Sequence, residues 1–118
     1  MSSTVFLSMT KAIEYLGDAS NAQRMLGTLE STLETEVPRI ASAIETQNFT
    51  NLQKIWHQLK GFAPVFCHDH MVAEITQTET LCKRIQLPDE QAAALKASTQ
   101  LLKHLQEMLS EVKAQQAS

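Results

Sequence analysis

The sequence predicts an all-α protein: an antiparallel four-helix bundle with a short additional N-terminal helix that caps one end. Only three glycines and three prolines occur among the 118 residues, and the helix-favouring residues Ala, Leu, Glu, Gln and Lys are abundant. No stretch alternates in the manner of a strand, and no Asn-Gly or Asp-Gly hairpin turn occurs. Apolar residues instead recur with helical spacing. At this length we expect a single domain, residues 1–118, with a core from about residue 6 to about residue 113.

Two helices are expected in the first part of the chain. The first, Val5–Leu16, is short and amphipathic. Asp18 or Ser20 then caps a second, long helix that ends at about Thr46, because either side chain can accept a hydrogen bond from the first turn. Pro38 falls inside this helix and removes one helical hydrogen bond, so a bend or a short break is expected there.

The central helix has the clearest amphipathic pattern and runs from Asn48, a suitable N-cap, to Phe66. At about 100° per residue, His57 points away from its apolar face. Pro64 is expected to kink or end the helix close to this histidine. The residues that share the apolar face are Leu52, Ile55, Trp56, Leu59, Phe62, Ala63 and Phe66.

Two further helices complete the predicted bundle. One spans about Asp69–Ile85 and carries Glu79 within its apolar stripe, where a carboxylate is rarely buried without a partner. We therefore expect Glu79 at an edge position or in a salt bridge, with a structural rather than a functional role. The last helix runs from Glu90 to about Lys113, after a turn at residues 87–89. The residues expected to face inward from it are Leu95, Leu102, Leu105, Leu109 and Val112.

Three residues of the central helix, His57, Lys60 and Gly61, form a candidate site. Lys60 and Gly61 follow the histidine at i+3 and i+4, so both lie beside it one turn further along. An exposed imidazole is largely neutral near pH 7 and is a competent nucleophile. A glycine inside a helix costs about 1 kcal/mol relative to alanine, and close approach by a partner would account for it. The three residues together at this spacing make a functional site more probable than any one of them does alone.

The run His57-x-x-Lys60-Gly61 resembles the core motif of histidine phosphotransfer (HPt) domains, the relays of two-component phosphorelays. The resemblance covers roughly Phe6 to Leu109. It includes Tyr15-Leu16-Gly17-Asp18, the segments 36–40 and 48–52, and Glu79, which stands where a glutamate commonly occurs in the family. Two residues depart from the pattern: Pro64 stands where the family usually has a small residue, and Cys67 where it often has glycine.

The resemblance implies that His57 accepts a phosphoryl group from a receiver-domain aspartate and passes it to another receiver domain. Lys60 would offset the charge of the phosphoryl group, and Gly61 would let the partner come close. The receiver, possibly part of a hybrid histidine kinase, would supply Mg²⁺, so the chain itself needs no cofactor. The other residues expected to contact the partner are Gln53, Lys54, Gln58 and Pro64.

Composition and missing motifs set limits on other functions. No glycine-rich phosphate loop or ATP-binding motif occurs, which disfavours a stand-alone kinase. The net charge of −3 and the lack of a basic stripe argue against nucleic acid as a partner. No membrane span or signal peptide is recognisable, and Cys67 and Cys82 are too few for a disulfide framework. We therefore expect a cytoplasmic, monomeric and free-standing protein.

Three alternatives remain open from the sequence. The first is a helical interaction module without phosphoryl chemistry. The second is a dimerisation domain of a sensor kinase, although an acidic residue normally follows the histidine there and Gln58 does so here. The third is a metal site at the run Cys67-His68-Asp69-His70, with Cys82 as a further ligand. Adjacent residues rarely converge on one ion, so a polar turn is the better interpretation and no metal is expected.

Overall fold

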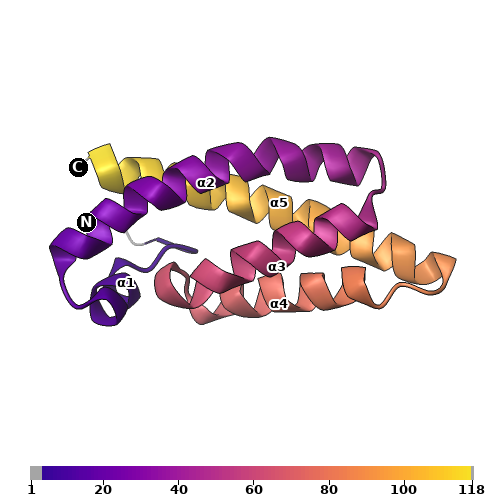
Figure 1. The fold of residues 1–118 in the computed structure, drawn as a ribbon, viewed down its shortest axis with the longest axis horizontal. Helices are drawn as coiled ribbons and strands as arrows, with labels where there is room; N and C mark the ends of the chain where they lie inside the picture. Colours follow the sequence, from indigo (N-terminus) through magenta and orange to yellow (C-terminus); the bar gives the residue numbers. More distant parts are fainter. Residues whose placement is uncertain (1–3, 118) are drawn as a thin grey trace.

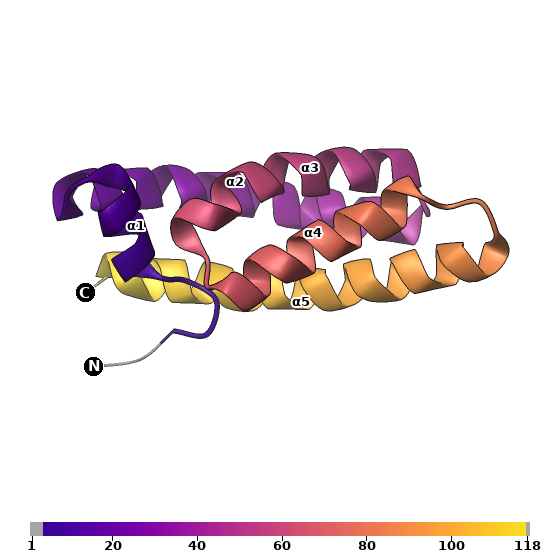
Figure 2. The same cartoon turned by 90° about the horizontal axis from the view of Figure 1, so that it is seen from below.

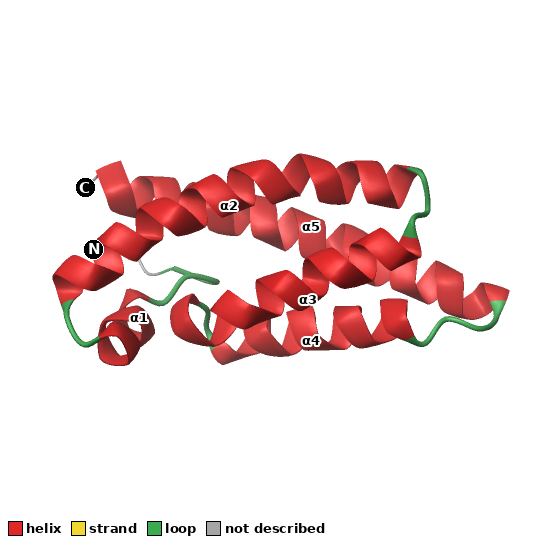
Figure 3. Cartoon of the chain, in the orientation of Figure 1, coloured by secondary structure: helices red, strands yellow, loops and turns green. Residues whose placement is uncertain are grey.

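Five helices account for most of residues 4–117, the part of the chain that this computed structural model describes. Within that range the only β-type pairing is an isolated bridge, so the predicted all-α class is confirmed (Figure 3). No helix in the same range is both long and apolar enough to cross a membrane. The helices are α1 (Met9–Leu16), α2 (Ala19–Glu45), α3 (Phe49–Phe66), α4 (Asp69–Lys83) and α5 (Pro88–Ala117).

Helices α2 to α5 form an antiparallel bundle, with α1 lying across one end (Figures 1 and 2). Each long helix packs against the next one in sequence, and α5 returns to pack against α2. The bundle measures 46 × 22 × 22 Å. One chain therefore supplies all four helices of the bundle, unlike a kinase dimerisation domain that builds it from two chains.

The N-terminal segment differs from the prediction, because α1 begins at Met9 rather than at Val5. The residues before it run along the bundle instead, and Leu7 forms an antiparallel bridge with Cys67. The Glu111 carboxylate of α5 accepts hydrogen bonds from the backbone N–H groups of residues 5, 6 and 7 at 2.7–3.1 Å. These contacts satisfy the backbone N–H groups of a bent, non-helical segment, so a helix is not needed there. Val5, the first residue of the predicted helix, is 58% exposed and lies outside the core.

Neither internal proline breaks its helix. Pro38 lies within α2 and Pro64 within α3, which continues to Phe66. The break considered at Pro38 and the helix end considered at Pro64 are therefore wrong. Both prolines are exposed, so water can replace the missing N–H group at the freed carbonyl. At the start of α2, Asp18 rather than Ser20 is the N-cap, and its carboxylate accepts from the N–H of Asn21 at 2.7 Å.

Helix α5 is rotated relative to the prediction. It begins at Pro88, two residues earlier than expected, and extends to Ala117. Of the five residues predicted to face inward, Leu105 and Val112 are fully buried, whereas Leu95, Leu102 and Leu109 are only partly buried. The buried face is formed by Ala94, Ser98, Leu101, Leu105, Met108 and Val112.

Candidate functional site

Helix α3 presents His57 to solvent because its opposite face is anchored in the core. Trp56 is fully buried, and its indole Nε1 donates a hydrogen bond to Ser98 Oγ of α5 at 3.2 Å. Leu59 is buried as well. With these neighbours facing inward, the His57 side chain is 66% exposed. The outward orientation predicted from the apolar pattern is therefore confirmed.

A buried carboxylate of the neighbouring helix holds the His57 ring. Nδ1 of His57 lies 2.9 Å from Oε2 of Glu79 on α4, whose side chain is only 6% exposed. An ionised carboxylate can only accept hydrogen bonds, so Nδ1 carries the proton in neutral His57. Within residues 4–117, the other ring nitrogen, Nε2, has no hydrogen-bond partner. The contact fixes the tautomer and the orientation of the ring and leaves the Nε2 lone pair at the surface.

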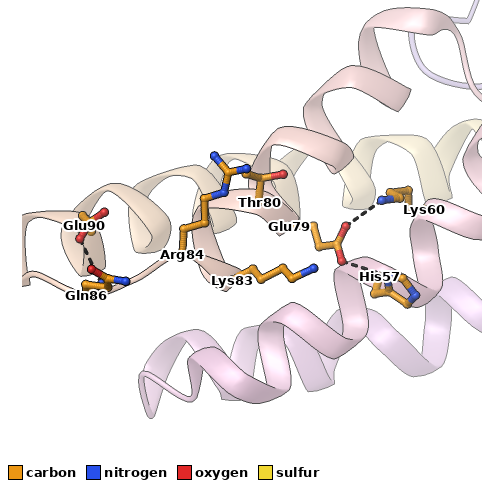
Figure 4. A pocket seen from close by; sticks show the side chains of 8 residues that line it. All are labelled: His57, Lys60, Glu79, Thr80, Lys83, Arg84, Gln86 and Glu90. Carbon is orange, nitrogen blue, oxygen red and sulfur yellow. Dashed lines mark hydrogen bonds and ion pairs between the residues drawn. The ribbon is translucent and has the colours of Figure 1, made fainter.

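Glu79 stays ionised because further donors converge on its carboxylate (Figure 4). Lys60 Nζ lies 3.0 Å from Oε1, and Gln53 Nε2 donates to Oε2 at 3.1 Å. The pKa of Glu79 is lowered from 4.5 to about 2, with the hydrogen bond from Lys60 as the largest cause, although burial acts in the opposite direction. His57 and Gln53 add to the lowering. The salt bridge expected for Glu79 is thus confirmed, and it connects Glu79 directly to the candidate site.

Lys60 and Gly61 occupy different surroundings one turn after His57. The Lys60 side chain is 40% exposed and its ammonium contacts Glu79. Gly61 is exposed, and a Cβ atom built on it would meet no other atom within 4 Å. Packing inside this chain therefore gives no reason for a glycine at position 61.

Three of the four other residues expected to contact a partner lie beside His57. Gln53, Lys54 and Gln58 line one shallow groove together with His57. Pro64 lies nearly two turns later on α3, outside that groove. The groove also includes a lysine from the end of α4 that the sequence analysis did not select. Its lining residues are Gln53, Lys54, His57, Gln58 and Lys83.

Sequence reasoning missed the contact between His57 and Glu79 and the position of Lys83 and Arg84 in the same region. The register of the two helices contains a signal for the contact. His57 and Glu79 lie at nearly the same distance before and after the turn at residues 67–68, so an antiparallel α3–α4 pair brings them together. The same comparison of distances does not show that the side chains of Lys83 and Arg84 lie near His57. Their direction depends on where α4 ends, which the sequence alone does not define.

The run from Cys67 to His70 does not form a cluster. Cys67 is buried with its Sγ 3.8 Å from the sulfur of Met108, and burial raises its pKa to about 12. Asp69 pairs with Lys11 at 3.0 Å, and His70 contacts a backbone carbonyl of the N-terminal segment. No group of three or more metal-ligand side chains converges within residues 4–117.

Comparison with known families gives one result. The model of the family described as Hpt domain matches residues 24–115, which is more than half of the chain. No curated protein and no solved structure matches the chain significantly.

Proposed function

The chain belongs to the Hpt domain family, and from this premise we propose that His57 is the residue on which it carries a phosphoryl group. Hpt domains serve phosphotransfer in phosphorelays, so a phosphotransfer role follows from family membership. The proposal adds the residue, the ring atom and the direction of transfer. Receiver domains give the phosphoryl group to His57 and take it from there.

The observation that supports His57 most strongly is its pairing with Glu79. The carboxylate lies 2.9 Å from Nδ1 and the ring is 66% exposed, so a nucleophilic Nε2 faces the solvent. A carboxylate at Nδ1 also stabilises the positive charge that the ring gains when Nε2 attacks phosphorus. His104 contacts the Glu74 carboxylate and His70 contacts a backbone carbonyl. Neither of them is followed by a lysine and a glycine at i+3 and i+4, as His57 is.

The proposed step is a direct transfer between two side chains. Nε2 of His57 attacks the phosphorus of the receiver's aspartyl phosphate, an N–P bond forms, and the P–O bond to the aspartate breaks. The aspartate leaves as a carboxylate, and Nδ1 keeps its proton toward Glu79. The reverse sequence on a second receiver returns His57 to its starting state, so no nucleotide and no external proton is consumed.

Lys60 and Gly61 support this step in different ways. Lys60 keeps Glu79 ionised and, being 40% exposed, also offsets the charge of the phosphoryl group. Gly61 leaves the surface beside His57 open for the partner. Gln53, Lys54 and Gln58 contact the partner from the groove that they share with His57, and Pro64 does so from the following turns.

The partners in this proposal are receiver domains, including one within a hybrid histidine kinase. The receiver supplies Mg²⁺, which proteins bind through carboxylates together with phosphate oxygens. We further propose that the chain acts as a monomer in the cytoplasm.

The test is phosphorylation of the wild-type chain and of a His57→Gln variant by phosphorylated receiver domains of the source organism. The wild type should gain phosphate that is labile in acid and stable in base, as expected of phosphohistidine. His57→Gln should gain none. A His68→Gln variant is the matched control, because the His68 side chain has no hydrogen bond in the described part of the chain.

Three results would contradict the proposal. Label that persists on His57→Gln would place the acceptor elsewhere. Loss of label on His68→Gln as well would show that the loss on His57→Gln is not specific to His57. No label on the wild type from any receiver would leave a helical interaction module as the better description.

A further inference from the structure

The surface between His57 and the end of α4 carries three cationic side chains that form no ion pair in the described part of the chain. Lys83, the last residue of α4, lines three separate grooves there, two of which also include His57. Its side chain points toward the His57–Glu79 pair (Figure 4). Arg84 follows it in the largest groove, and Lys54 joins it in the second. We call Lys54, Lys83 and Arg84 the cationic rim.

The cationic rim is not balanced by nearby carboxylates. Within residues 4–117, none of its three side chains forms an ion pair. The two acids of the largest groove already have other partners. Glu79 contacts Lys60, and Glu90 accepts hydrogen bonds from the backbone N–H groups of residues 86 and 87 at 3.0 and 2.8 Å. The rim is therefore a positive surface on a chain whose net charge is −3.

Helix electrostatics explain only part of this arrangement. Cations are favoured at the C-terminal end of a helix, which accounts for Lys83 and Arg84 at the end of α4 without any partner. Lys54 has no such reason, because it lies within the first half of α3, one turn before His57. Two helices thus contribute cations to the same side of the histidine.

We propose that the cationic rim is the docking surface for the acidic mouth of a receiver domain, which approaches His57 from the α4 side. This inference rests on the proposed function. A phosphorylated aspartate that is held with Mg²⁺ lies among carboxylates, so the surface around it is negative. Such a partner is repelled by the overall charge of this chain and attracted by the rim, which orients the encounter so that the phosphoryl group meets Nε2. Pro64 lies on the other side of His57 along α3 and contributes less to docking.

The experiment compares two phosphodonors of different size on the same variants. One is the receiver domain that transfers fastest in a panel of all receivers of the source organism. The other is phosphoramidate, a small donor that needs no docking surface and releases ammonia when His57 takes its phosphoryl group. The variants are Lys83→Glu and the double change Lys54→Glu with Lys83→Glu. Lys103→Glu is the matched control, an exposed lysine of α5 without an ion pair in the described range.

Charge reversal at Lys83 should lower the second-order rate with the receiver about tenfold more than the rate with phosphoramidate. The double variant should lose more, and Lys103→Glu should behave as the wild type. The wild-type rate with the receiver should fall between about 50 mM and about 500 mM salt, and the double variant should lose most of this dependence.

The outcomes separate this inference from the proposed function. Docking through the cationic rim would be overturned if the rim variants lose the same fraction of the rate with both donors. It would also be overturned if Lys103→Glu lowers the rate with the receiver as much as Lys83→Glu does. Labelling by phosphoramidate without transfer from any receiver would overturn it as well, while His57 stays a phosphoacceptor. Absence of label from both donors would instead contradict the proposed function itself.

Discussion

Replacing Gly61 by alanine should stabilise the protein and impair its transfer reaction at the same time. Gly61 lies inside α3 and has an ordinary helical backbone, since Gly17 is the only glycine of the described chain with a positive φ. A Cβ atom at position 61 would meet nothing within 4 Å. The substitution therefore adds a methyl group to the exposed surface one turn after His57 and disturbs no packing.

The expected gain in stability follows from the helix propensities. Alanine is favoured over glycine by about 1 kcal/mol in a helix interior, and no clash opposes it here. For a domain of this length the melting temperature should rise by about 4 °C. Urea or thermal unfolding followed through Trp56, the only tryptophan, measures this change.

The expected loss concerns the reaction with a protein partner. If Gly61 lets the receiver come close, an added methyl group displaces the phosphoryl donor from Nε2, and a misplacement of this kind slows transfer at least about tenfold. Phosphoramidate, being small, should still label His57 at a similar rate.

Gly27→Ala provides the control for Gly61→Ala. Gly27 lies inside α2, and its added Cβ atom would be 3.9 Å from Oε1 of Gln116, an ordinary contact. This variant should gain similar stability and keep the wild-type transfer rate. The reasoning is refuted if Gly61→Ala transfers as fast as the wild type. It is also refuted if Gly61→Ala is destabilised, because the glycine would then serve the fold.

Three further predictions concern stability and reactivity. Glu79→Gln should destabilise the fold at pH 7 by about 1–2 kcal/mol, less than the full shift implies because Lys60 is partly exposed. Because the pKa of Glu79 is lowered, the difference in unfolding free energy from the wild type should be complete above about pH 4.5 and should disappear as the pH falls toward 2. Urea unfolding across this pH range measures the difference, with Glu107→Gln as the exposed control. A difference that stays constant with pH would contradict the prediction. Cys67 and Cys82, whose pKa values burial raises, should not react with a thiol reagent until the protein unfolds. Asp18→Ala should cost about 1 kcal/mol in urea unfolding because it removes the N-cap of α2, and an equal cost for Ser20→Ala would refute that assignment.

Local patterns were sufficient for the position of His57. The apolar stripe of α3 is long and includes Trp56 and Leu59 at the core, so only one rotation of the helix buries it. That rotation leaves His57 at the surface whatever the other helices do. The all-α class follows for the same reason, because long amphipathic stretches need only a partner of the same kind.

Other features depend on contacts between distant residues and could not be derived from local patterns. The sequence predicts a helix for the segment before Met9, but Glu111, from the far end of the chain, binds three of its backbone N–H groups, and the segment is not helical. In α5, Leu101 and Leu102 are adjacent and equally apolar, so the sequence does not show which one faces the core. The fully buried residue is Leu101, and packing against α2 and α4 decides this.

The role proposed for Glu79 shows how a residue that looks structural can also serve a functional site. Its place in the apolar stripe predicted an edge position or a salt bridge, and the structure shows a buried carboxylate with a salt bridge. In the proposed function this burial strengthens the effect of Glu79 on His57. A buried carboxylate is poorly solvated, so it binds the Nδ1 proton more strongly than an exposed one would. The same burial requires a cation, and Lys60 provides it at 3.0 Å. In the proposed transfer Lys60 is shared between Glu79 and the phosphoryl group, so further positive charge at the site would have to come from elsewhere. Lys83, which has no ion pair within residues 4–117, lies beside the same pair of residues and is placed to supply it.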